Sequence, residues 1–75
     1  MKAEEIRTKI EVGLPGSRVE VRDTTGTGDH FEAVIVAQQF TGKSMVEQHR
    51  MIYSILGSAM AGPIHALALR TSAAD

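Results

Sequence analysis

The chain of 75 residues contains no cysteine, no tryptophan and no asparagine. Without cysteine it can form no disulfide and can supply no thiolate to a metal. Without asparagine it has no N-glycosylation sequon. Its aromatic residues are limited to two Phe and one Tyr, which is few for a surface on which nucleic-acid bases would stack.

Long apolar runs and an excess of one charge are also missing. No stretch approaches the roughly 20 apolar residues that a membrane span requires, and the start of the chain is too acidic and polar for a signal peptide. The net charge of −1 gives no global positive field for tight, non-specific nucleic-acid binding. A hydrophobic content of 43% is enough for a packed core. We therefore expect one soluble, cytoplasmic domain over residues 1–75, with no membrane association.

The periodicity of apolar residues predicts five elements. A helical spacing of four positions joins Ile6, Ile10 and Leu14, whereas strict alternation around Val19 and Val21 indicates a half-buried strand. The predicted elements, in chain order, are a helix at residues 2–14, strands at 17–23 and 30–37, a helix at 45–58 and a strand at 64–70. Residues 72–75 are predicted to be a frayed tail.

The order of these elements predicts an α+β fold. The short polar loop between the first two strands favours an antiparallel hairpin, and the long helix would serve as a crossover to the third strand. We expect a small three-stranded sheet with helices packed on one face. The predicted core residues occupy the apolar phase of each element and are Ile6, Ile10, Val19, Val21, Phe31, Ile35, Ile52, Leu56 and Leu67.

Local patterns add two details. Ser44 followed by Glu47 has the capping-box spacing at the start of the long helix. One side of that helix is predicted to carry Met45, His49, Ile52, Leu56 and, beyond its end, Met60. The Gly26-Thr27-Gly28 segment lacks the third glycine and the following helix of a phosphate-binding loop, so turn geometry explains it better.

The three histidines are the main chemical signal in the chain. His30 begins a predicted strand directly after the loop, and His65 begins another; His49 lies in the apolar stripe of the long helix. We expect His49 to be partly buried and hydrogen-bonded rather than a metal ligand. No zinc triad and no nucleophile elbow accompany these residues. The sequence therefore predicts a binding protein rather than an enzyme.

Two stretches resemble a known family. They read Phe40-x-Gly42-Lys43-Ser44-x-Val46-x-x-His49-Arg50-Met51-Ile52-Tyr53 and Gly62-Pro63-Ile64-His65-Ala66-Leu67. Their combination and order are similar to the BolA family, as is His30-Phe31-Glu32 after a glycine-containing loop. The resemblance extends from the first helix through the third strand and is closest to compact bacterial members.

That resemblance implies an α-β-β-α-β arrangement similar to a class II KH domain, with a short extra turn before the long helix. It also implies a non-enzymatic partner of a monothiol glutaredoxin, sharing a [2Fe–2S] cluster in iron–sulfur cluster trafficking or in iron and redox regulation. By position, His65 matches the family's C-terminal histidine ligand, and His30 is the candidate second ligand. Glutaredoxin and glutathione would supply the thiolates, and the isolated chain would hold no cluster.

Two alternatives remain open from the sequence. One is a nucleic-acid-binding transcriptional regulator that uses the KH-like fold, although the chain has no Gly-x-x-Gly loop of the kind that clamps a nucleic-acid backbone. The other is a module that only self-associates, for example as a homodimer.

Overall fold

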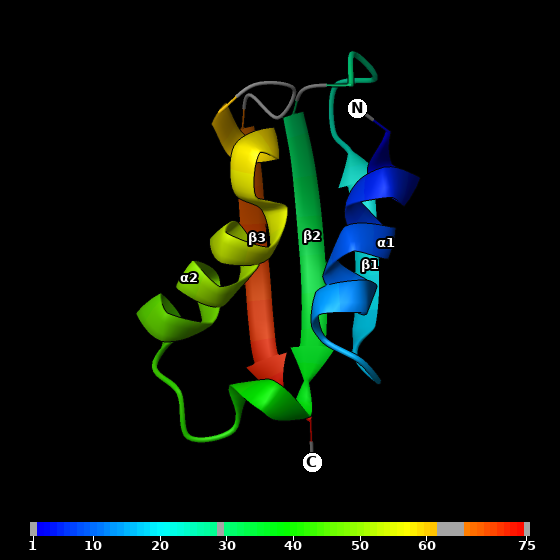
Figure 1. The fold of residues 1–75 in the computed structure, drawn as a ribbon. Helices are drawn as coiled ribbons and strands as arrows, with labels where there is room; N and C mark the ends of the chain where they lie inside the picture. The colour runs from blue at the N-terminus through cyan, green and yellow to red at the C-terminus, as the bar shows by residue number, and fades with distance from the viewer. Residues whose placement is uncertain (1, 29, 62–65, 75) are drawn as a thin grey trace.

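The computed structural model describes residues 2–28, 30–61 and 66–74. Its elements are α1 (Ala3–Gly13), β1 (Arg18–Asp23), β2 (His30–Ala37), the 3₁₀ helix η1 (Gln38–Phe40), α2 (Met45–Leu56), the 3₁₀ helix η2 (Gly57–Ala61) and β3 (Ala66–Ala73) (Figure 1). This confirms the predicted α-β-β-α-β order. The turn η1 before α2 also agrees with the arrangement that the family resemblance implied.

The three strands form one mixed sheet in the order β1-β2-β3. β1 and β2 are antiparallel neighbours, as expected for a hairpin, and β3 runs parallel to β2. Because a parallel neighbour requires a crossover connection, the chain between β2 and β3 passes over the sheet as α2. Both helices lie on the same face of the sheet (Figure 1), which confirms the predicted α+β architecture.

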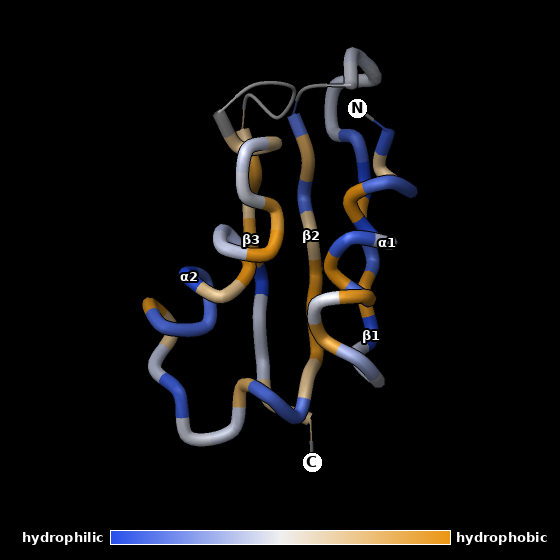
Figure 2. Tube along the Cα trace, in the orientation of Figure 1, coloured by the Kyte–Doolittle hydropathy of each residue, from blue (hydrophilic) through white to orange (hydrophobic). Residues whose placement is uncertain are grey.

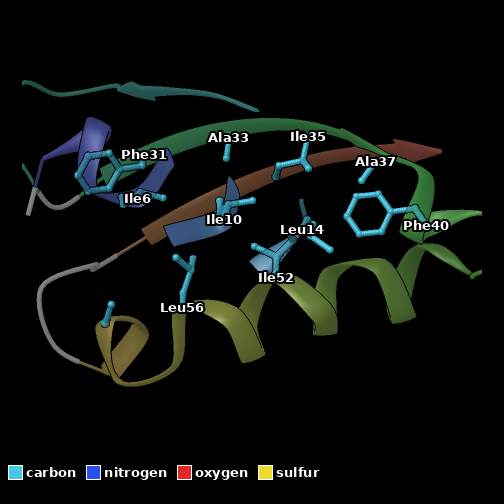
Figure 3. Close-up of a cluster of buried hydrophobic side chains, with 11 residues drawn as sticks. Ile6, Ile10, Leu14, Phe31, Ala33, Ile35, Ala37, Phe40, Ile52 and Leu56 are labelled. Carbon is cyan, nitrogen blue, oxygen red and sulfur yellow. The ribbon is translucent and has the colours of Figure 1, made fainter. Parts of the chain in front are cut away.

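The core lies between this face of the sheet and the two helices, and β2 is its central strand (Figures 2 and 3). Six of the nine predicted core residues are buried: Ile6, Ile10, Phe31, Ile35, Ile52 and Leu56. Val19, Val21 and Leu67 are only half-buried and pack against the core from its margin. These three belong to the edge strands β1 and β3, which the helices cover less completely than β2.

Several buried residues are missing from the predicted core. They are Leu14, Ala33, Ala37, Phe40 and Ala59. Phe40 is the largest of the fully buried side chains, at 0% exposure. It comes from η1, where a three-residue turn has too little length to display a hydrophobic period. The turn thus places the aromatic ring under α2 rather than serving only as a link.

The buried side of α2 differs from the predicted stripe. Met45 is 54% exposed, whereas Gln48 is only 7% exposed. The buried stripe of the helix therefore begins at Gln48 and continues with Ile52 and Leu56, at intervals of four residues. The Gln48 amide nitrogen donates to the Lys43 carbonyl oxygen at 3.0 Å. This bond satisfies the amide nitrogen of Gln48, whereas its Oε1 atom is buried without a partner among the described residues, so the cost of burying this side chain is only partly compensated.

The end of the chain is more ordered than predicted. β3 continues through Ser72 and Ala73, which pair with Val36 and Ala37 of β2. The Ala74 N–H then donates to the Ala37 carbonyl at 3.2 Å. The prediction of a frayed tail is therefore wrong for residues 72–74, because pairing with the full length of β2 compensates for the weak strand propensity of serine and alanine. Residue 75 lies outside the described residues. The first two residues of the predicted third strand, 64 and 65, lie outside the described residues.

The start of α2 has the predicted capping box. The Glu47 N–H donates to the Ser44 hydroxyl at 3.2 Å, and the Ser44 N–H donates to the Glu47 carboxylate at 3.0 Å. The bond from the Ser44 N–H, which favours the ionised carboxylate, lowers the pKa of Glu47. The carboxylate is thus held at the positive end of the helix, where it satisfies an otherwise unpaired donor.

α1 and α2 are in close contact at Gly13. A Cβ atom built on Gly13 would lie 2.8–2.9 Å from three side-chain carbons of Ile55. Separations this short are repulsive, so the absence of a side chain at Gly13 allows Ile55 to pack directly on the α1 backbone. The spacing of the two helices therefore depends on glycine at this position.

We expect the substitution Gly13→Ala to destabilise the protein by about 1–3 kcal/mol through overpacking. The direction of the change in the free energy of unfolding is informative, because alanine in an unobstructed helix is more favourable than glycine by about 1 kcal/mol. Urea denaturation followed by circular dichroism measures the effect. In an Ile55→Ala background the obstruction is gone, and the same substitution should become neutral or stabilising. Destabilisation of equal size in both backgrounds would refute the packing explanation.

Candidate functional site at one end of the sheet

His30 lies at one end of the sheet. It is the first residue of β2, is half-buried, and follows the loop that leaves β1. Its carbonyl oxygen accepts from the Thr24 N–H at 2.9 Å and from the Thr24 hydroxyl at 3.2 Å. These bonds close the hairpin, so the backbone of His30 is fixed by the antiparallel pairing of β1 and β2.

The start of β3 lies beside His30. In the parallel register, His30 pairs with Ala66, and the next pair is Phe31 with Leu67. Ala66 directly follows His65 in the sequence. His65, the predicted main ligand, lies outside the described residues. The structure therefore brings the first residue of β2 next to the first residue of β3.

The loop between β1 and β2 is organised around the carboxylate of Asp23. One of its oxygens accepts from the N–H groups of Thr25 at 3.2 Å and Gly26 at 2.8 Å. The other accepts from the Gly28 N–H at 2.9 Å. Gly26 and Gly28 both have positive φ angles, of 76° and 79°, a conformation that glycine adopts without strain.

This arrangement explains why the glycine pair is not a phosphate-binding loop. Its N–H groups point to an anion, as in phosphate-binding loops, but the anion is the protein's own carboxylate. The prediction that these glycines serve turn geometry is consistent with the arrangement, whereas the role of Asp23 was missed. The signal was present, since aspartate before Thr-Thr-Gly is typical of a side chain that bonds to the backbone two or three residues later.

His49 belongs to another part of the molecule, the second turn of α2, which begins near the opposite end of the sheet (Figure 1). It is half-buried, as predicted. The predicted hydrogen bond is not found at its Nε2 atom, which is buried without a partner among the described residues. The helix stripe thus predicted the burial of the ring but not its polar environment.

The described parts of the chain contain no cluster of three or more His, Asp or Glu side chains that could hold a metal ion. They also contain no helix long and apolar enough to cross a membrane. Since the whole chain lacks cysteine, the site at the sheet end can offer imidazole nitrogen to a metal but no thiolate.

Comparison with known proteins gives consistent matches to one family. A family model described as BolA-like protein matches residues 7–75. BolA-like protein 1 of Pongo abelii is 36% identical over 72 residues, which cover 87% of this chain and 53% of that protein. The chain thus spans about half the length of the first curated relatives that it matches.

In two further matches, the aligned region covers a larger share of the matched protein. The DNA-binding transcriptional regulator BolA of Escherichia coli strain K12 is 36% identical over 78 residues, covering 95% of this chain and 74% of the relative. A solved structure of a bolA protein homologue from Coxiella burnetii superposes with a TM-score of 0.80 at 42% identity, covering 95% of this chain and 88% of the other.

Asp23→Ala should disorder the loop that precedes His30, because three N–H donors lose their shared acceptor. We expect a loss of about 1–3 kcal/mol in the free energy of unfolding and faster amide exchange at Thr25, Gly26 and Gly28. Hydrogen–deuterium exchange followed by NMR measures the local effect. Asp23→Asn, which keeps one acceptor oxygen, should give an intermediate result. Unchanged exchange at all three amides in Asp23→Ala would contradict this role of the carboxylate.

Proposed function

Because the chain belongs to the BolA family, we propose that it is a non-enzymatic partner of a monothiol glutaredoxin. The two proteins would share a [2Fe–2S] cluster, in iron–sulfur cluster trafficking or in iron and redox regulation. The observation that carries the proposal is the register between β2 and β3, in which His30 pairs with Ala66, the residue after His65. His30 thus begins β2, and Ala66, which follows His65 in the sequence, begins the neighbouring strand β3.

The metal-ligating side chains of this chain fit a cluster shared with another protein better than a cluster held by this chain alone. It offers histidine but no cysteine, so thiolates would come from glutaredoxin and glutathione. A [2Fe–2S] cluster with mixed histidine and cysteine ligation carries less negative charge, and has a higher reduction potential, than one with thiolates alone. We propose His65 as the main ligand of this chain and His30 as the second candidate.

The strands supply the positioning that such a site requires. His30 has its backbone fixed on both sides, by the hairpin bond to Thr24 and by pairing with Ala66. A ligand on a rigid element loses little conformational freedom when it binds. The Asp23-centred loop supports this end of the sheet, since it leads directly into the strand that His30 begins.

The three histidines make a matched test. Cluster-loaded monothiol glutaredoxin is mixed anaerobically with the wild-type chain, and the complex is followed by visible circular dichroism. We expect the wild-type chain to change the spectrum of the cluster and His65→Ala to abolish that change. His30→Ala should give a smaller effect, and His49→Ala, the control on α2, should behave as wild type.

Thermal melts of the same variants separate loss of a ligand from loss of the fold. A wild-type spectrum from folded His65→Ala would contradict the assignment of His65, and a loss confined to His30→Ala would move the main ligand to the hairpin. An unchanged glutaredoxin spectrum, with no complex on size exclusion, would refute the proposal as a whole.

A second candidate function is DNA binding, which is supported by the name of the Escherichia coli relative, a DNA-binding transcriptional regulator. The net charge of −1 is unfavourable for it, because phosphate contacts supply most of the affinity of non-specific complexes. The exposed arginines of this chain are interspersed with glutamates, and one of them, Arg22, pairs with Glu32 at 3.3 Å.

Titration of a labelled DNA duplex at increasing salt distinguishes the two functions. If this chain is mainly a glutaredoxin partner, we expect weak binding at most, lost steeply as the salt concentration rises. A complex that survives physiological salt and discriminates among sequences would favour the regulator instead.

A further inference from the structure

A groove lies between the two helices on the side of α1 and α2 where Gly13 meets Ile55. It consists of two hollows, of about 340 Å³ and about 390 Å³, and both are lined by these two residues. The first hollow extends toward Leu14, Met51 and Arg50. The second extends toward Val12, Thr8 and Lys9. We refer to the two together as the α1–α2 groove.

The floor and rim of the groove are largely apolar. Val12 is 75% exposed, more than any other large hydrophobic side chain in the described part of the chain. Ile55 and Met51 are half-buried and pack against the core from its margin. The fold itself does not need Val12 in this position, since the buried residues of α1 are Ile6 and Ile10. Val12 and the apolar side chains of the two hollows thus form one continuous apolar surface between the helices.

The charged residues that line the groove are both basic. Lys9 lines one hollow and Arg50 the other, and no acidic residue lines either. The carboxylates one turn before them, Glu5 and Glu47, accept from the N-cap backbone N–H groups of their own helices. Neither Lys9 nor Arg50 forms a salt bridge with any described residue. The groove therefore presents an apolar centre with one basic side chain in each hollow, although Arg50 also interacts electrostatically with Glu47, whose pKa it helps to lower.

We propose that the α1–α2 groove binds a short acidic–apolar segment of a partner protein. Apolar side chains of the segment would occupy the hollows on the two sides of the Gly13–Ile55 contact. Its carboxylates would pair with Lys9 and Arg50. This occupant satisfies both properties of the surface at once: burial of Val12 and Ile55 from water, and neutralisation of the two cations.

The proposal goes beyond the shared cluster and does not depend on it, because neither histidine candidate lines the groove. It can therefore fail while the glutaredoxin function holds, and the reverse is equally true. Nucleic acid fits the surface less well, since its phosphates would neutralise the cations but leave the apolar centre without a partner.

The test begins with selection of a displayed random peptide library on the full-length chain. Enriched peptides are synthesised and their affinities measured by fluorescence anisotropy. We expect enrichment of sequences in which acidic residues flank apolar ones. In a ¹⁵N-labelled protein, these peptides should shift the amide signals of Val12, Gly13 and Ile55.

Charge reversal provides the decisive comparison. Lys9→Glu combined with Arg50→Glu should weaken the selected peptides by about tenfold or more, and replacing their Glu by Lys should restore binding. The matched control is Arg18→Glu combined with Arg70→Glu. Both arginines are exposed, and they belong to β1 and β3, so this control should bind as wild type does.

Four outcomes would overturn the proposal. They are the absence of an acidic–apolar consensus, equal binding by the charge-reversed and control variants, peptide-induced shifts confined to other surfaces, and concentration-dependent dimerisation with signals from the groove changing on dilution. The last would assign the surface to a second copy of the chain.

Discussion

The parallel pairing of β2 with β3 is the constraint on which the other features depend. It requires the chain to cross over the sheet, so α2 must lie on one face, beside α1 (Figure 1). The core forms between that face and the two helices, around the central strand β2. The same pairing brings the starts of β2 and β3 together and thereby creates the sheet end at which His30 lies. One backbone register thus determines both the location of the core and that of the candidate site.

The two surfaces argued to bind partners have different physical origins. The sheet end depends on backbone hydrogen bonds, which fix the strands whatever their side chains. The α1–α2 groove depends on side-chain volume, since it exists because Gly13 leaves room for Ile55. A chain of this size can therefore offer two separate contact surfaces. One would act through metal ligation by histidine, and the other through shape and charge complementarity. An adaptor that acts without catalysis would use both.

Periodicity predicted the elements well because it reports directly on burial in regular structure. Ile6 and Ile10, spaced one helical turn apart, are fully buried, as is Ile35 of β2. The failures occur where burial depends on tertiary contacts. Phe40 is buried from a turn too short to show a period, and Gln48 is buried with only its amide nitrogen bonded to a backbone carbonyl. Likewise, the pairing of Ser72 and Ala73 with β2 could not be read from their weak strand propensity. For the site, the sequence predicted His30 at a strand start but not the register that pairs it with Ala66.

We propose above that a histidine of this chain coordinates an iron–sulfur cluster shared with a monothiol glutaredoxin. Pulsed electron paramagnetic resonance of the reduced complex tests it most directly, because the ¹⁴N nucleus of a coordinated imidazole couples to the unpaired electron, whereas a thiolate sulfur gives no such nitrogen signal. We expect imidazole coupling in the wild-type complex and its loss in His65→Ala. A reduced wild-type complex without imidazole coupling would contradict it.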